Sequence, residues 1–234
     1  MEEFVRNLTQ VWRAHGLGSY GVLVARTRRH DADAGGPAEI VEAKHVVRQR
    51  VWDALRDEKI ARFPGAHGRI PNFVGAQAAA ERLRETDVWK QARTLKCNPD
   101  SAQWPVRQRA LEDGKTVYMA VPRLAEEAPF FLLDPDDLDD TPRKASSIKG
   151  ASRSGRTVAV SDLEPVDLVV TTGVSGATGE IPVTDHDVRL DLLVTPDRVV
   201  TCTREVRHPG RIVWDELTEE KIAAIPLLRR LRPF

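Results

Sequence analysis

The stretch TLKCNPDSAQWPVRQRALEDGKTVYMAVP, residues 94–122, decides the fold. Residues 94–97 and 115–122 are rich in apolar and β-branched side chains and predict two strands. Between them, Asn98-Pro-Asp-Ser101 predicts a turn, and residues 105–113 predict a helix that has proline in its first turn and is followed by glycine. Strand, turn, helix and strand in this order are typical of an α/β protein.

Helices are expected before this stretch. In residues 39–62, Ile40, Val47, Val51 and Leu55 share one stripe at helical spacing, which predicts an amphipathic helix that ends before Pro64-Gly65. A second helix is expected from a capping Asn72 to Arg84, and a short third one after Thr86.

Strands are expected after it, with one more helix near the end of the sequence. The expected strands are residues 129–134, 157–160, 167–170 and 190–195. A helix capped by Thr218 follows. This order predicts a three-layer α/β/α domain with a mostly parallel sheet over residues 39–234, preceded by an atypical extension and linker at residues 1–38.

Composition excludes several classes of protein. The 35 basic and 35 acidic side chains leave a net charge of zero, so the chain as a whole has no electrostatic attraction for nucleic acid or an anionic membrane. Its apolar runs are strand-sized, far below the ~18 residues of a membrane span. Cys97 and Cys202 lack metal-ligand spacing and fit reduced thiols. We expect a cytoplasmic protein without a membrane partner, and nucleic acid is the least expected ligand.

Seven blocks of sequence, taken in order, resemble the 5-formyltetrahydrofolate cyclo-ligase family in its methenyltetrahydrofolate-synthetase-domain branch. The blocks are Lys44-His-Val-Val-Arg48 with Val51-Trp52, residues 62–75, Lys96-Cys-Asn-Pro-Asp100, residues 114–124, Ser147-Ile-Lys-Gly-Ala151, Pro165-Val-Asp-Leu-Val-Val170, and residues 181–187 leading into Thr195-Pro196.

The resemblance implies a fold and a reaction. The implied fold is three-layered, like that of the NagB/RpiA/CoA-transferase proteins. The implied reaction is ring closure of a small-molecule folate, 5-formyltetrahydrofolate, to 5,10-methenyltetrahydrofolate, with ATP and Mg²⁺. Phosphorylation turns the formyl oxygen into a good leaving group, so the protein must position two substrates and neutralise phosphate charge.

The resemblance also suggests nucleotide-binding residues. Lys44 and Arg48 match a basic pair that contacts ATP phosphates, and their spacing puts both on one helix face. Without the resemblance, an ordinary solvated basic face is the favoured interpretation of this pair, because such pairs are common. Asp187 matches a position near the nucleotide and is the candidate metal contact; a turn or capping aspartate is the alternative.

Three further residues lie in segments that resemble the folate-facing loops of the family. They are Phe73, Asn98 and Asp100. The polar pair can bind a pterin ring, although simple turn formation by Asn98-Pro-Asp100 also explains it. Tyr118 and Met119 are expected in the core.

The sequence departs from the family at one place. The family carries a Gly-x-Gly-x-Gly-Tyr loop after the strand that corresponds to residues 167–170, and this sequence lacks it. Gly173 and Gly176 offer backbone amides to a phosphate in its place, or they belong to a plain connector.

Three functions therefore compete. The first is an active cyclo-ligase. The second is a catalytically degenerate member that binds folate or nucleotide, which the missing glycine loop favours. The third is a sugar-phosphate enzyme, supported by fold analogy alone.

Overall fold

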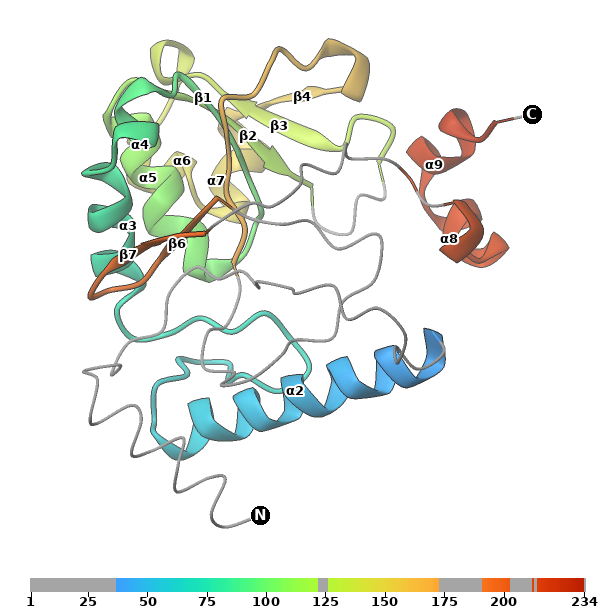
Figure 1. Ribbon diagram of the computed structural model, residues 1–234. Coiled ribbons are helices and arrows are strands. Elements are labelled where there is room, and N and C mark those ends of the chain that lie inside the picture. Colours follow the sequence, from blue (N-terminus) through green and yellow to red (C-terminus); the bar gives the residue numbers. More distant parts are fainter. Residues whose placement is uncertain (1–36, 122–125, 173–190, 203–211, 213, 234) are drawn as a thin grey trace. The chain divides into compact units, whose positions relative to one another are not determined.

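The computed structural model describes residues 37–121, 126–172, 191–202, 212 and 214–233 (Figure 1). Nearly all of the predicted extension at residues 1–38, together with Gly173, Gly176 and Asp187, lies outside the described residues. The chain divides into two compact units. Unit 1 comprises residues 1–82 and 173–209, and unit 2 comprises residues 83–172 and 210–234.

Unit 2 is built on a five-stranded sheet of order β4-β3-β2-β1-β5. The strands are β1 (Thr94–Cys97), β2 (Thr116–Ala120), β3 (Phe130–Leu133), β4 (Arg156–Val158) and β5 (Leu168–Val169). β1 is parallel to β2 and β5, whereas β3 is antiparallel to β2 and β4, so four of the five strands run in one direction.

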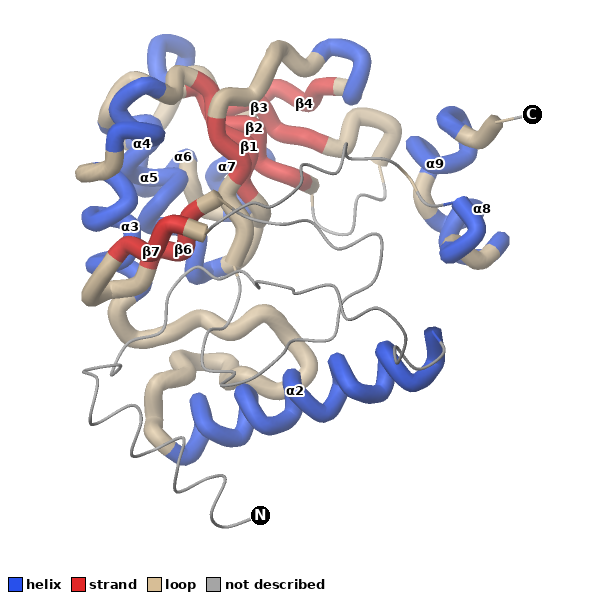
Figure 2. The backbone as a smooth tube through the Cα atoms, in the orientation of Figure 1, coloured by secondary structure: helices blue, strands red, loops and turns tan. Residues whose placement is uncertain are grey.

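The described helices of unit 2 are α4 (Asp87–Gln91), α5 (Trp104–Glu112), α6 (Pro142–Ala145), α7 (Ile148–Ser154), α8 (Glu219–Ala224) and α9 (Pro226–Leu231). α5 packs against β2 and α7 against β3, with α6 between the two helices (Figure 2). A mostly parallel sheet flanked by helices is the predicted fold class, consistent with three α/β/α layers.

Side-chain caps explain why several boundaries follow the sequence closely. Thr86 caps α4 by accepting a hydrogen bond from the Trp89 N–H, and Thr218 caps α8. The Asp167 carboxylate accepts the backbone N–H groups of Arg93 (2.7 Å) and Thr94 (3.0 Å), which joins β5 to the start of β1.

The described part of unit 1 contains two helices and a hairpin. They are α2 (Pro37–Asp57), α3 (Ala76–Arg84, which runs into unit 2), β6 (Leu192–Val194) and β7 (Val199–Thr201). The strand predicted at residues 190–195 is β6, which pairs with β7 in a separate antiparallel sheet. Arg82 on α3 donates to the Pro196 carbonyl from Nε (3.2 Å) and Nη2 (3.0 Å) and anchors this hairpin.

Two predicted helix boundaries were wrong. The first helix ends at Asp57, not at residue 62, because the chain turns through Lys59 with φ of 57°. Ile60 N–H bonds the Leu55 carbonyl (2.9 Å) and Lys59 N–H bonds the Arg56 carbonyl (3.0 Å), the pattern of a Schellman C-cap. Glycine usually marks such a cap, and lysine gives no such signal.

Asn72 is the second correction, because it does not cap α3. Its side-chain oxygen accepts the neighbouring Phe73 N–H (3.0 Å), and the helix begins after Gly75. Gly75 has φ of 97°, and a Cβ atom there would lie 2.6 Å from Pro196 Cγ. Only glycine fits this turn.

The predicted core position of Tyr118 and Met119 is confirmed, since both are buried in β2. Of the described helices, none combines the length and the apolar character that crossing a membrane requires.

Candidate functional site

A topological switch point lies between β1 and β5. After β1 the chain builds β2, β3 and β4 on one side, and then returns to place β5 on the other side of β1. In open α/β sheets, ligands bind beyond the carboxyl ends of the strands at such a point.

Four polar residues gather at this place: Lys96 from β1, Asn98 and Asp100 from the loop that follows it, and Thr172 from the segment after β5. We call them the switch-point cluster. Val170 N–H bonds the Lys96 carbonyl (2.8 Å) and holds the two strand ends together. Lys96 Nζ donates to Asn98 Oδ1 (2.5 Å). The structure thus brings together the predicted Asn98 and Asp100, with two residues that were not predicted.

Burial shifts the pKa values of the charged groups in the cluster. It raises the pKa of Asp100, although Arg107, Thr172, Lys96 and Asn98 act in the opposite direction. Burial also lowers the pKa of Lys96. A carboxyl group and an ammonium group that have both lost water are typical of binding and catalytic sites.

The side-chain hydroxyl of Thr172 lacks a hydrogen-bond partner among the described residues. The residue is 8% exposed, and its Oγ1 atom has no hydrogen-bond partner in the part of the chain that the structure describes. The hydroxyl is close enough to Asp100 to lower the pKa of that carboxyl, but it makes no hydrogen bond of standard geometry.

Two buried side chains fix the loop that carries Asn98 and Asp100. Arg107 on α5 is 1% exposed and donates from Nη1 to the Asn98 carbonyl (2.5 Å) and the Asp100 carbonyl (3.1 Å). Its Nε donates to the Ser146 carbonyl (2.9 Å). Gln103, also buried, accepts the Asn98 N–H (2.9 Å) and donates to Asp100 Oδ2 (3.2 Å). The loop is therefore preorganised.

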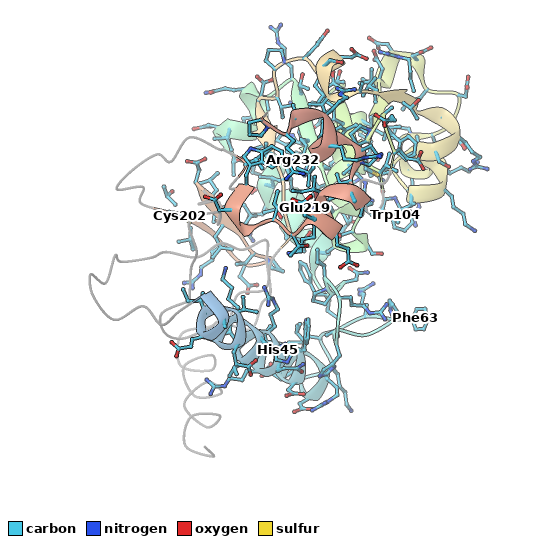
Figure 3. All side chains as sticks on the ribbon, turned by 90° about the vertical axis from the view of Figure 1, so that its right-hand side faces the viewer. His45, Phe63, Trp104, Cys202, Glu219 and Arg232 are labelled. Carbon is cyan, nitrogen blue, oxygen red and sulfur yellow. The ribbon has the colours of Figure 1, made fainter. Side chains whose placement is uncertain are left out.

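Burial lowers the pKa of Arg107 to about 10, so the guanidinium stays charged at neutral pH. Trp104, at the start of α5, lies nearer the surface and also holds this helix in place (Figure 3). The indole N–H donates to Ser146 Oγ (3.0 Å) and to the Arg143 carbonyl (3.1 Å). Both contacts tie α5 to the corner between α6 and α7.

Cys97 is excluded from the site chemistry. Strand alternation puts it on the opposite face from Lys96, and it is fully buried. Burial raises the pKa of its thiol to about 11, so the thiol stays protonated. Within the described ranges, no three His, Cys, Asp or Glu side chains are arranged to hold a metal ion.

The other predicted residues lie in unit 1. Lys44 and Arg48 are on α2, where Lys44 is half-buried and Arg48 exposed; the labelled His45 marks this part of the helix in Figure 3. Phe73 is buried, at 3% exposure. Ligand contacts of these three residues stay predictions.

Sequence reasoning missed Lys96, Thr172 and Arg107 as site residues. Lys96 lies between the apolar Leu95 and Cys97, and Thr172 follows the apolar run of β5, so both carried a weak signal. Arg107 carried none, since an arginine in a short helix normally faces solvent.

Comparison with known proteins gives the family. The model of the 5-formyltetrahydrofolate cyclo-ligase family matches residues 40–179, a range that contains Lys44, Arg48 and the whole switch-point cluster. The chain belongs to this family. The cyclo-ligases are ATP-dependent enzymes, and no solved structure matches the chain.

Curated relatives of this cyclo-ligase family member are named methenyltetrahydrofolate synthase domain-containing protein. The mouse relative (Mus musculus) is 31% identical over 81% of this chain and 63% of its own length. The bovine relative (Bos taurus) is 30% identical over 81% and 62%, and the human relative (Homo sapiens) is 25% identical over 84% and 63%. The chain thus spans somewhat less than two thirds of the relatives it matches.

Proposed function

We propose that this protein catalyses the reaction of its family, the ATP-dependent conversion of 5-formyltetrahydrofolate to 5,10-methenyltetrahydrofolate, in cytoplasmic one-carbon metabolism. The switch-point cluster is the observation that carries the proposal. In this reaction the formyl oxygen attacks the γ-phosphate of ATP and displaces ADP, N10 then attacks the activated carbon and loses its proton, and inorganic phosphate leaves. Binding and positioning of two substrates are the main tasks of the protein.

Asn98 and Asp100 are proposed to hold the pterin ring of the folate. A carboxylate accepts ring N–H groups, and an amide both donates and accepts. Arg107 and Gln103 hold the backbone of both residues in place. Because the cluster is half-buried, a hydrogen bond to a ligand is stronger there than in water.

Lys44 and Arg48 are proposed to neutralise the phosphates of ATP, one helical turn apart on α2. Gly173 and Gly176 are proposed to offer backbone amides to the same phosphates. Asp187 is proposed to contact the Mg²⁺ that accompanies ATP in this family.

Absorbance-monitored conversion of 5-formyltetrahydrofolate with Mg-ATP tests the proposal. We expect turnover in the wild-type protein and a raised KM for ATP in Lys44→Ala, since a phosphate contact is lost. Lys90→Ala, which removes an exposed lysine of α4, is the matched control and should leave the KM unchanged. No turnover would reject the cyclo-ligase proposal, and an unchanged KM in Lys44→Ala would remove Lys44 from the site.

The missing Gly-x-Gly-x-Gly-Tyr loop favours a second candidate, a non-catalytic binder of folate or nucleotide. Such a protein keeps a binding site but lacks the amides that stabilise a transferring phosphoryl group. Calorimetry with ATP and with 5-formyltetrahydrofolate, each alone, separates the two candidates. Binding without turnover is the expected result for the binder, and binding of neither compound rejects it.

A further inference from the structure

We propose that Lys96 and Thr172 bind substrate together with Asp100, and that the three side chains recognise the lactam edge of a flat heterocycle, where a ring N–H lies beside a ring carbonyl. The inference rests on the proposed function and deepens it, because it names the edge of the pterin that unit 2 binds and adds two residues to the site.

Thr172 supplies the first observation. A buried hydroxyl without a partner is uncommon in folded proteins and calls for an explanation. The hydroxyl of Thr172 lies beside the Asp100 carboxyl at the switch point, where a ligand is expected on topological grounds. An acceptor atom of a bound ligand gives this hydroxyl its missing partner.

Lys96 and Asp100 supply complementary groups next to it. Gln103 donates to Oδ2 of Asp100, and Asn98 and Thr172 lie close enough to lower the pKa of this carboxyl. In the proposed complex, Oδ1 accepts an N–H from the ligand. The Lys96 ammonium has three protons, of which Asn98 Oδ1 takes one. Its remaining protons can bind a carbonyl oxygen. Donors from Lys96 and Thr172 therefore lie beside an acceptor from Asp100.

This arrangement selects among ligand classes. A lactam presents a carbonyl and an N–H side by side and matches the cluster on both groups. Phosphate presents acceptors only, and the Asp100 carboxylate would repel it. Adenine has no carbonyl. The shared chemistry is the lactam edge, which occurs in the pterin of a folate and in guanine.

Two ligand pairs, three threonine variants and one lysine variant test the inference by calorimetry on the full chain. Pterin and 2,4-diaminopteridine differ at the lactam, and guanosine and adenosine provide the same contrast without the phosphates that α2 is proposed to bind. Thr172→Val removes the hydroxyl without changing the shape of the side chain, and Thr171→Val is the control on the neighbouring residue. Thr172→Ser keeps the hydroxyl and should bind as the wild type does. A Lys96→Met variant removes the ammonium.

We expect the wild-type protein to bind pterin at least tenfold more tightly than 2,4-diaminopteridine, an order of magnitude typical for a buried hydrogen bond. Thr172→Val and Lys96→Met should each weaken pterin binding about tenfold, and Thr171→Val should not. Equal pterin affinities of Thr172→Val and Thr171→Val would overturn the inference. Preference for guanosine over pterin would support the lactam edge and reject folate as its source.

Turnover distinguishes this inference from the proposed function. If the wild-type protein does not turn over 5-formyltetrahydrofolate but Thr172→Val loses pterin binding, the lactam site stands and the cyclo-ligase activity fails. If turnover occurs and the KM for 5-formyltetrahydrofolate is the same in Thr172→Val, the activity stands and the lactam site fails.

Discussion

The two ends of the main sheet use similar residues for different purposes. At the amino ends of β1 and β2, Arg84, Trp89, Asp113 and Lys115 form what we call the amino-end cluster. Asp113 Oδ2 accepts hydrogen bonds from Trp89 Nε1 (2.9 Å) and Arg84 Nε (2.8 Å). Lys115 Nζ donates to the Ala92 carbonyl (2.6 Å) and lies 5.6 Å from the centre of the Trp89 ring.

The carboxyl groups of the two clusters shift in opposite directions. Burial acts to raise the pKa of Asp113, but hydrogen bonds from Arg84 and Trp89 outweigh it and hold the pKa below its usual range. Burial wins at Asp100, whose pKa is raised. The amino-end cluster therefore satisfies its own carboxylate, whereas in the switch-point cluster the Thr172 hydroxyl has no hydrogen-bond partner among the described residues. We propose that similar side chains stabilise the fold at one end and bind substrate at the other.

The largest effect on stability is expected from Arg107→Met. It leaves the buried carbonyl of Ser146 and the partly buried carbonyls of Asn98 and Asp100 without their donor, at a cost of about 3 kcal/mol. Urea unfolding measures this loss. Arg153→Met removes an exposed arginine as the control and should cost less than about 0.5 kcal/mol. A loss below about 1 kcal/mol for Arg107→Met would show that the loop does not depend on Arg107.

Alanine variants of Asp113 and Asp100 test whether the two clusters have different roles. Asp113→Ala should lower the free energy of unfolding by about 1–2 kcal/mol and leave folate affinity unchanged, because it breaks charge-assisted hydrogen bonds remote from the site. Asp100→Ala should cost less stability and abolish folate binding. Urea unfolding and calorimetry on both variants provide the measurements, and a loss of folate affinity in Asp113→Ala would contradict the division of roles.

The smallest effect is a difference in pH dependence. Because its folded-state pKa is lowered, Asp113 adds stability above about pH 4 and loses it as the pH falls through the folded pKa. Asp100 has the opposite effect on stability. Its folded-state pKa is raised, so ionisation of this carboxyl lowers stability as the pH rises through that pKa, and the loss disappears in acid.

Asparagine variants isolate these contributions. From pH 3 to pH 7, Asp113→Asn should lose stability relative to the wild type and Asp100→Asn should gain it, each by less than about 1 kcal/mol because both carboxyl groups are only partly buried. Unfolding by urea at the two pH values measures the difference. Changes of the same sign in both variants would refute the contrast.

Much of the fold was predictable because its signals are local. The strand at Thr94–Cys97, the cap at Thr86 and the helix of residues 104–112 follow from side-chain patterns and capping chemistry within a few residues. The end of α2 was not predictable, since Lys59 adopts a left-handed conformation that glycine normally signals.

The site was only partly predictable. Asn98 and Asp100 are close in sequence, and a family resemblance singled them out. Thr172 lies far along the chain from both and joins them only because β5 pairs with β1. The pairing of β5 with β1 and the missing hydrogen bond of Thr172 arise only in the folded chain. No local sequence pattern predicts them.

Thermal unfolding with 5-formyltetrahydrofolate tests most directly whether the switch-point cluster is the ligand site. At about 100 times the Kd, a ligand that binds only the folded protein adds about 2.7 kcal/mol, which raises the Tm by several degrees. The wild-type protein and Asp113→Ala should both show this rise, and Asp100→Ala should not. An equal rise in Asp100→Ala would contradict the central claim.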